Sequence, residues 1–138
     1  MKIAFDSNVL LDAIANREHG AEAQELVLAV ASDQALGLVT ANSITDIYYI
    51  ARKHLGDAAA REAVRNILTV FDIATVGGED CSAALEVPMK DFEDALLAVC
   101  AKRDGANYIA TRDEAFISSN APVPAMKPER LLRLLKSH

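Results

Sequence analysis

Four aspartates stand where the chain passes between predicted strands and helices, so they could share one site. Asp6 and Asp113 follow apolar, strand-like stretches. Asp46 and Asp94 lie in the first turns of predicted helices. Unit charges about 5 Å apart repel by roughly 3 kcal/mol at an effective dielectric constant of about 20, so such a cluster requires a cation or raised pKa values. Oxygen ligands favour hard cations such as Mg²⁺ or Mn²⁺, which support phosphodiester hydrolysis.

Each acid has a simpler explanation when it is taken alone. Aspartate is favoured at the N-terminus of any helix because it caps free N–H groups and interacts with the helix dipole. The joint occurrence of four such acids favours a common site instead. Asp91 and Asp94 are three residues apart and share a helix face, so either or both could reach that site, with Asp94 preferred, whereas Glu93 is expected to point elsewhere.

The elements that must position these acids alternate between strand and helix. Ser43 is a plausible N-cap for the helix that carries Asp46. No two predicted strands are joined by a turn of hairpin length, which indicates a parallel α/β sheet of about four to five strands with helices on both faces, in a single domain over 1–138. Functional residues are then expected at the carboxyl ends of the strands. The predicted strands are 2–5, 36–40, 73–76, 107–111 and 122–126, and the helices lie at about 9–14, 20–30, 43–56, 57–71, 80–85, 91–103 and 129–136.

The order and spacing of four sequence blocks carry a resemblance to a known family. The blocks are Phe5-Asp6-Ser7-Asn8-Val9-Leu10-Leu11-Asp12, Ser43-Ile44-Thr45-Asp46, Asp91-Phe92-Glu93-Asp94-Ala95-Leu96-Leu97-Ala98 and Tyr108-Ile109-Ala110-Thr111-Arg112-Asp113. With them the chain resembles, over nearly its whole length, a PIN domain, the ribonuclease fold of the toxins of VapBC-type toxin–antitoxin pairs. The resemblance implies a three-layer fold and a ribonuclease that depends on Mg²⁺ or Mn²⁺.

The resemblance also implies roles for particular residues. The catalytic, metal-binding acids would be Asp6, Asp46, Asp94 and Asp113, with Asp91 as a further candidate ligand and Asn8 and Thr111 as supporting polar groups. The second acid is commonly Glu in this family, so the shorter Asp46 leaves open whether its contact with the metal is direct or through water. The expected products carry a 5′-phosphate and a 3′-hydroxyl.

Partners follow from the same resemblance. It implies an RNA substrate, a homodimer, and a small antitoxin that covers the active-site groove. Arg112, between Thr111 and Asp113, is the predicted phosphate contact. Tyr48 and Tyr49 are expected in the core, although the apolar face of their helix could instead form an interface with a second copy or an antitoxin. No aromatic cluster predicts base stacking.

The charge of the chain bears on the RNA prediction. The 138 residues include 20 acidic and 14 basic side chains, a net charge of -6, which by itself argues against a nucleic-acid partner. Two Mg²⁺ ions bound to the four aspartates would formally cancel four of these six charges. The acidity therefore indicates a requirement for cations rather than the absence of RNA.

Other classes fit the sequence less well. A phosphatase of the haloacid-dehalogenase type needs a second acid where Asn8 stands, and the glycines of dinucleotide and P-loop sites are missing. No apolar run predicts a membrane span and no signal pattern is apparent, so a cytoplasmic location is expected. The remaining alternative is a PIN-like module that binds RNA or a protein without cutting it. Four clustered acids count against this alternative, because they repel one another and would have no metal to bind.

Overall fold

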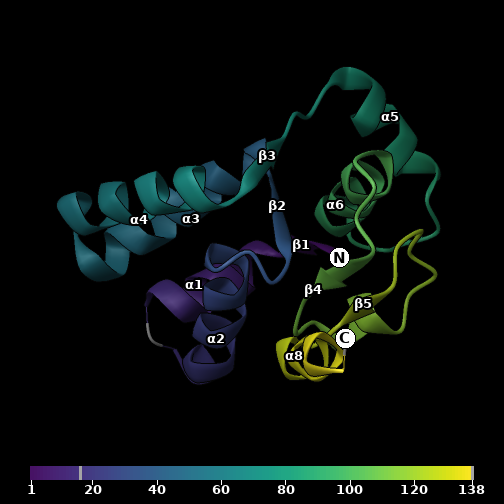
Figure 1. Cartoon of the computed structure of the whole chain (residues 1–138). Helices are drawn as coiled ribbons and strands as arrows, with labels where there is room; N and C mark the ends of the chain where they lie inside the picture. Colours follow the sequence, from purple (N-terminus) through teal and green to yellow (C-terminus); the bar gives the residue numbers. More distant parts are fainter. Residues whose placement is uncertain (16, 138) are drawn as a thin grey trace.

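A computed structural model describes residues 1–15 and 17–137, and it confirms the predicted three-layer α/β architecture (Figure 1). The five strands form one all-parallel sheet in the order β3-β2-β1-β4-β5. No described helix is both long and apolar enough to span a bilayer. The strands are β1 (Lys2–Phe5), β2 (Leu36–Thr40), β3 (Asp72–Ala74), β4 (Tyr108–Ala110) and β5 (Ala125–Met126). The helices are α1 (Ser7–Ile14), α2 (Gly20–Ala31), α3 (Ala41–Leu55), α4 (Asp57–Val70), α5 (Gly78–Glu86), α6 (Phe92–Arg103), α7 (Glu114–Ile117) and α8 (Pro128–Lys136).

Successive residues of a strand point to opposite faces, and both faces of this sheet are covered by helices. On one face Ile3, Phe5 and Val39 pack against residues from α1 to α4 and α8. On the other face Ala4, Leu38 and Ile109 pack against residues of α5, α6 and α7. The central strands β1 and β4 are buried on both sides over most of their length, and both begin with a partly exposed residue and continue as apolar runs.

Two predictions about the elements need correction. The helix that carries Asp46 begins at Ala41 and not at Ser43, because Thr40 is the extended residue before it. The buried Ser43 hydroxyl instead forms a 2.7 Å hydrogen bond with the Thr40 hydroxyl. Asp46 therefore lies in the second turn of α3. The second difference is α7, a helix of four residues that the sequence patterns do not indicate.

The prediction that both tyrosines of α3 lie in the core is also wrong in part. Tyr48 is half-buried and packs against the core, whereas Tyr49 is 58% exposed. Adjacent residues of a helix point about 100° apart, so one face of α3 cannot bury both rings.

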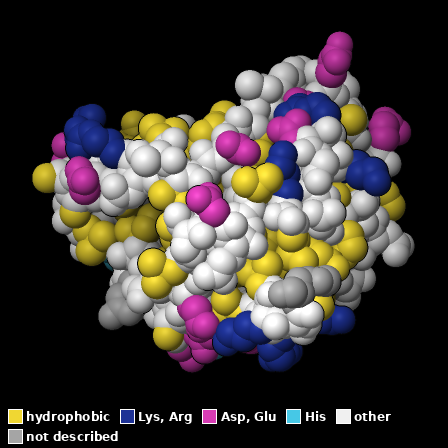
Figure 2. Space-filling model, in the orientation of Figure 1, with side chains coloured by type: hydrophobic (Ala, Val, Ile, Leu, Met, Phe, Trp, Pro, Cys, Tyr) yellow, Lys and Arg dark blue, Asp and Glu magenta, His cyan; other side chains and the backbone are white. Residues whose placement is uncertain are grey.

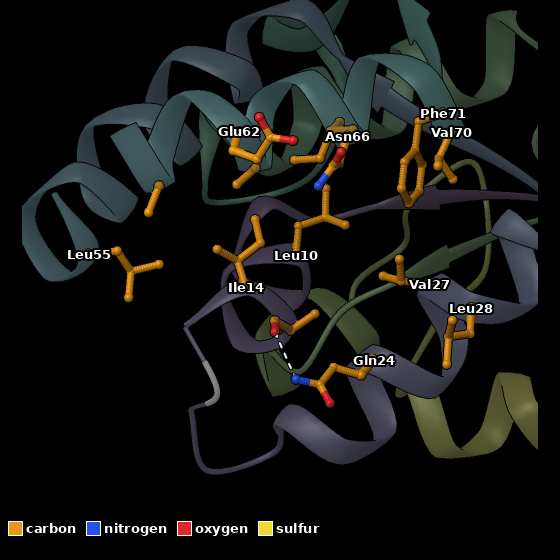
Figure 3. A pocket seen from close by; sticks show the side chains of 14 residues that line it. Leu10, Ile14, Gln24, Val27, Leu28, Leu55, Glu62, Asn66, Val70 and Phe71 are labelled. Carbon is orange, nitrogen blue, oxygen red and sulfur yellow. Dashed lines mark hydrogen bonds between the residues drawn. The ribbon is translucent and has the colours of Figure 1, made fainter. Parts of the chain in front are cut away.

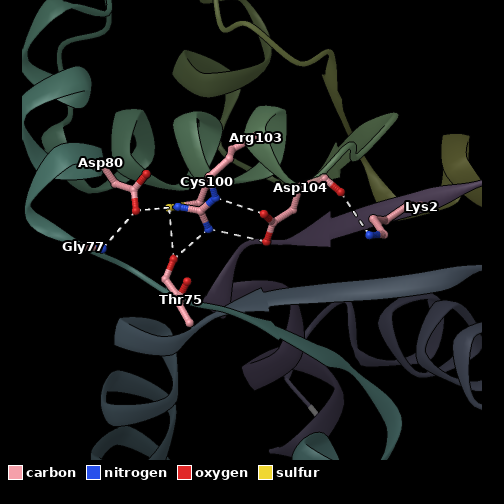
Figure 4. Close-up of polar contacts among 7 residues, drawn as sticks. All are labelled: Lys2, Thr75, Gly77, Asp80, Cys100, Arg103 and Asp104. Carbon is pink, nitrogen blue, oxygen red and sulfur yellow. Dashed lines mark hydrogen bonds and ion pairs between the residues drawn. The ribbon is translucent and has the colours of Figure 1, made fainter.

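The C-terminal end of α6 is fixed by a polar network around Arg103 (Figure 4). The Arg103 guanidinium donates to the carboxylates of Asp80 and Asp104 and, over 2.7 Å, to the carbonyl of Thr75. The Lys2 ammonium donates to the Asp104 carbonyl over 3.0 Å. These bonds tie α6 to β1 and to the β3–α5 connection, so the helix that carries Asp94 is held firmly against the sheet.

Gly37 of β2 leaves no room for a side chain, which gives a test of the packing. A Cβ at this position would lie 2.5 Å from Cδ2 of Phe71 and 2.8 Å from Cγ1 of Val30. Phe71 is buried and packs edge to face on Phe5, with ring centroids 5.0 Å apart, so it cannot move aside. We expect Gly37→Ala to lower the free energy of unfolding by about 1–3 kcal/mol in urea denaturation.

Gly78→Ala is the matched control because a Cβ there meets no atom within 4 Å. An equal loss of stability in both variants would contradict the described packing of β2.

Candidate active site

Two neighbouring strands place the first two acids. Asp6 directly follows β1 and caps α1, while Thr111 directly follows β4, which pairs with β1. The fully buried Thr111 hydroxyl donates to Asp6 Oδ2 over 2.8 Å and accepts from the backbone N–H of Asp113 over 3.1 Å. One threonine thus links both predicted acids at the carboxyl edge of the sheet.

Asp113 and Asn8 complete this part of the site. The exposed Asp113 caps α7 and accepts from the N–H of Ala115 over 2.9 Å. The backbone N–H of Asn8 donates to Asp6 Oδ1 over 3.4 Å, while the Asn8 residue is exposed. The support that Asn8 gives to Asp6 in this structure therefore comes from its backbone.

Helix α6 brings the third acid to the same place. Asp91 caps this helix and accepts from the N–H of Asp94 over 3.0 Å. Partial burial, followed by the charges of Asp91, Asp6 and Asp113, raises the pKa of Asp94 to about 7. Burial also raises the pKa of Asp6, against the lowering effect of the hydrogen bonds from Thr111 and Asn8. The carboxylates of Asp91, Asp6 and Asp113 are thus close enough to Asp94 to influence its ionisation.

Glu93 is the residue that sequence reasoning misses. The helical pattern predicts that it points away from the site, but its carboxyl group interacts with that of Asp46. Burial, a hydrogen bond to Asp46 and the charges of Asp46 and Asp91 raise the pKa of Glu93. Glu93 therefore connects Asp46 on α3 to the acids of α6.

The donor set of the site meets the needs of a divalent cation. All candidate ligands are oxygens, which suits Mg²⁺ or Mn²⁺, and the mutual repulsion that raises the pKa of Asp94 is what a cation would relieve. One helical turn before Asp46, the buried Oδ1 of Asn42 has no hydrogen-bond partner, so it is a further acceptor on that face of α3. Within 1–15 and 17–137, no three His, Cys, Asp or Glu side chains are gathered closely enough to enclose an ion as they stand.

Arg112 points away from the acidic site. Its guanidinium lies 2.8 Å from Glu129 of α8, 3.8 Å from Asp12 of α1 and 4.0 Å from Glu22 of α2, and the side chain is 16% exposed. Partial burial would raise the pKa of Glu129, but the bonds from Arg112 and from its own backbone N–H lower it overall. Three carboxylates already neutralise this cation, so the arrangement does not support the predicted phosphate contact.

A separate apolar groove lies between α1, α2 and the α3–α4 hairpin (Figure 3). It has a volume of about 630 Å³ and contains none of the predicted acids. Leu28 and Leu55 on its border are 65% and 44% exposed, and Figure 2 shows hydrophobic side chains gathered beside α4. Exposed apolar surface of this kind is typical of a protein-binding site.

The parallel sheet and the carboxyl groups at its edge define an α/β protein with an all-oxygen, acidic site. The model of the family described as "PIN domain" matches residues 2–115, and the chain belongs to this family. It is 27% identical over 131 residues, 88% of each chain, to "Ribonuclease VapC1" of Aquifex aeolicus (strain VF5).

Two solved structures share the fold. One is VapBC2 of Rickettsia felis bound to a DNA fragment from the promoter, with a TM-score of 0.71 and 13% identity over 92% of this chain and 98% of that one. The other is VapC20 of Mycobacterium tuberculosis, described as a sarcin-ricin loop cleaving toxin. It has a TM-score of 0.68 and 18% identity over 83% of this chain and 92% of that one.

Proposed function

We propose that this PIN-domain protein is an endoribonuclease that hydrolyses RNA phosphodiester bonds with Mg²⁺ or Mn²⁺ at the acidic site, as the toxin of a toxin–antitoxin pair. The observation that supports the proposal is the position of Asp6 and Asp113 just after β1 and β4, with Asp94 of α6 near enough that burial and the charges of neighbouring acids raise its pKa to about 7. The names of the Aquifex aeolicus and Mycobacterium tuberculosis relatives support RNA as the substrate.

In this proposal the chain's own residues hold and orient the cation. Asp6, Asp94 and Asp113 would bind it, with Asp46 or Asp91 completing the set directly or through water. Thr111 and the Asn8 N–H hold one oxygen each of the Asp6 carboxylate, which fixes its orientation. The bound cation would lower the pKa of a coordinated water and neutralise charge on the scissile phosphate. Asp94 must release its proton before it can act as a ligand.

The proposal is tested by incubating the purified protein with single-stranded and structured RNA in Mg²⁺, in Mn²⁺ and in chelator. We expect internal cuts that leave 5′-phosphate ends in either cation and none in chelator. Cutting that persists in chelator would contradict the metal-dependent reaction. RNA binding without cutting in either cation would favour the alternative, a PIN-like binding module without catalysis.

The raised pKa of Asp94 predicts a dependence on pH. A carboxyl group with a pKa of about 7 is roughly one-tenth ionised at pH 6 and nine-tenths ionised at pH 8, so Mn²⁺ should bind about tenfold more weakly at pH 6. Calorimetric titration with Mn²⁺ measures this difference. The same titration of Asp94→Asn should show weak binding with a smaller dependence on pH.

Without a cation, the stability of the folded protein should fall as the pH rises, whereas the affinity for Mn²⁺ should increase. Folding raises the pKa of Asp94, so its contribution to stability is fully present below the unfolded pKa of 3.8 and is lost as the pH rises through about 7. The cation-free protein should therefore melt at a lower temperature at pH 8 than Asp94→Asn does. An equal melting temperature for the two proteins at pH 8 would contradict the crowding of charge around Asp94.

The groove beside α4 supports the antitoxin part of the proposal. We infer that it binds an apolar segment of a small partner protein, because its border leucines are exposed and the Rickettsia felis relative is a complex of two proteins. A homodimer belongs to the same proposal and is tested by light scattering. Growth that is unaffected when the protein is expressed alone would count against toxicity.

A further inference from the structure

Two aromatic side chains are exposed although the rest of the aromatic set is buried or half-buried. The chain has four phenylalanines and three tyrosines, all within the described residues. Only Tyr49, at 58%, and Phe92, at 45%, are exposed. They belong to α3 and α6, the two helices that carry Asp46 and Asp94. Exposed aromatic rings therefore stand on both helices that bring acids to the site.

Tyr49 lies on the same face of α3 as Asp46. The two residues are three apart, and Lys53 follows four residues after Tyr49, so all three lie along one side of the helix. Helix α3 begins directly after the carboxyl end of β2, and Asp46 lies in its second turn, so this side of α3 starts at the sheet edge where Asp6 and Asp113 lie. Tyr49 and the exposed Lys53 follow Asp46 along the same side of α3, one and two turns further from the start of the helix.

The Tyr49 ring also has a fixed support. It packs edge to face on Tyr48, with ring centroids 5.0 Å apart. Tyr48 is held in turn by a hydrogen bond from its hydroxyl to Asp57 and by the guanidinium of Arg61, 5.5 Å from its ring centroid. A supported ring loses little conformational entropy when another ring stacks on it, so Tyr49 is suited to bind a flat ligand.

Phe92 is the first residue of α6 and stands between the capping Asp91 and Glu93. The residue is therefore adjacent in sequence to two acids of the candidate site, at the N-terminus of α6. The exposed Lys90 precedes it by two residues. Neither Lys53 nor Lys90 takes part in an ion pair within 1–15 and 17–137, so each exposed ring has an unpaired cation near it in sequence.

We propose that Tyr49 and Phe92 are specificity-determining residues that stack on unpaired nucleobases on either side of the scissile phosphodiester. This inference rests on the proposed ribonuclease function. A chain with a net charge of -6 gains little from general attraction to phosphates, so stacking, which needs no charge, supplies affinity next to the carboxylates. Bases in a duplex are paired and stacked on each other and cannot reach both rings.

The absence of tryptophan from the chain allows a direct test. Tyr49→Trp and Phe92→Trp, each made with Asp94→Asn so that RNA stays intact, introduce a single fluorophore. We expect saturable quenching by an unstructured RNA oligonucleotide and little quenching by a fully paired RNA of equal length. Leu68→Trp, at a position 52% exposed on α4, is the control and should not respond. Equal quenching by both RNAs, or none, would overturn the inference.

Alanine variants give a second, independent measurement. Tyr49→Ala and Phe92→Ala should each raise KM for single-stranded RNA about fivefold or more with little change in kcat, while Tyr49→Phe keeps the wild-type KM. Unchanged KM in both alanine variants, or a changed oligomeric state with unchanged RNA binding, would overturn the inference. Quenching in the tryptophan variants together with no RNA cleavage by the wild-type protein would contradict the ribonuclease function alone. Cleavage by the wild-type protein without quenching in those variants would contradict the stacking alone.

Discussion

Asp6→Asn and Asp94→Asn should each lower kcat/KM for RNA cleavage by at least about 100-fold. Residues that only support metal ligands typically cost 10- to 100-fold when they are changed, so loss of a ligand itself should cost at least as much. Gel assays of RNA cleavage in Mn²⁺ measure the change. Both substitutions keep the shape of the side chain, and in Asp6→Asn the amide oxygen could still accept the hydrogen bond from Thr111.

Asp72→Asn provides a matched control for charge. Asp72 is an exposed aspartate at the start of β3, the end of the strand away from the carboxyl edge where Asp6 lies. This variant should cleave RNA at the wild-type rate. If Asp6→Asn or Asp94→Asn retained more than a tenth of the wild-type activity, that aspartate would not be a metal ligand required for cleavage.

Arg112→Met should have its effect on stability and not on substrate affinity. The substitution removes the cation that Asp12, Glu22 and Glu129 share. Loss of one partner from a fully buried ion pair costs about 3–5 kcal/mol. The cost here should be nearer 2 kcal/mol because Glu22 and Glu129 are each about 40% exposed. Urea denaturation measures the change.

Arg17→Met is the control for this prediction. Arg17 lies 3.3 Å from the same Asp12 carboxylate but is 45% exposed, so its loss should cost less than about 1 kcal/mol. If Arg112→Met were as stable as the wild type and raised KM for RNA, that result would support the predicted phosphate contact and contradict the structural role of Arg112.

The position of a side chain could be predicted from the sequence where the strand or helix that carries it is enough to determine that position. Asp6 and Asp113 follow apolar strands, and parallel strands end at a common edge, so their proximity could be predicted before the structure was known. Most element positions followed from the periodicity of apolar residues. The start of α3 did not, because Ser43 resembles an N-cap but bonds to Thr40 inside the protein. The four-residue α7 is too short for a periodic pattern.

The sequence was least informative at the site where the direction of a side chain depends on distant elements. The effect of Asp46 on the pKa of Glu93 joins a residue of α3 to one of α6, and no local sequence pattern encodes such a pair. Arg112 has a long side chain that reaches α8, whose Glu129 lies 17 residues along the chain. Tyr49 is exposed because it lies away from the face of α3 that buries Ser43, Ile47 and Ala51.

The most direct test of the account is to locate a Mn²⁺ ion by anomalous diffraction from crystals grown with this cation near pH 8. We expect a peak among the carboxylates of Asp6, Asp94 and Asp113, and no peak there in Asp94→Asn crystals. A peak at another place on the protein, with these three carboxylates free of metal, would contradict the proposal that they form the catalytic centre.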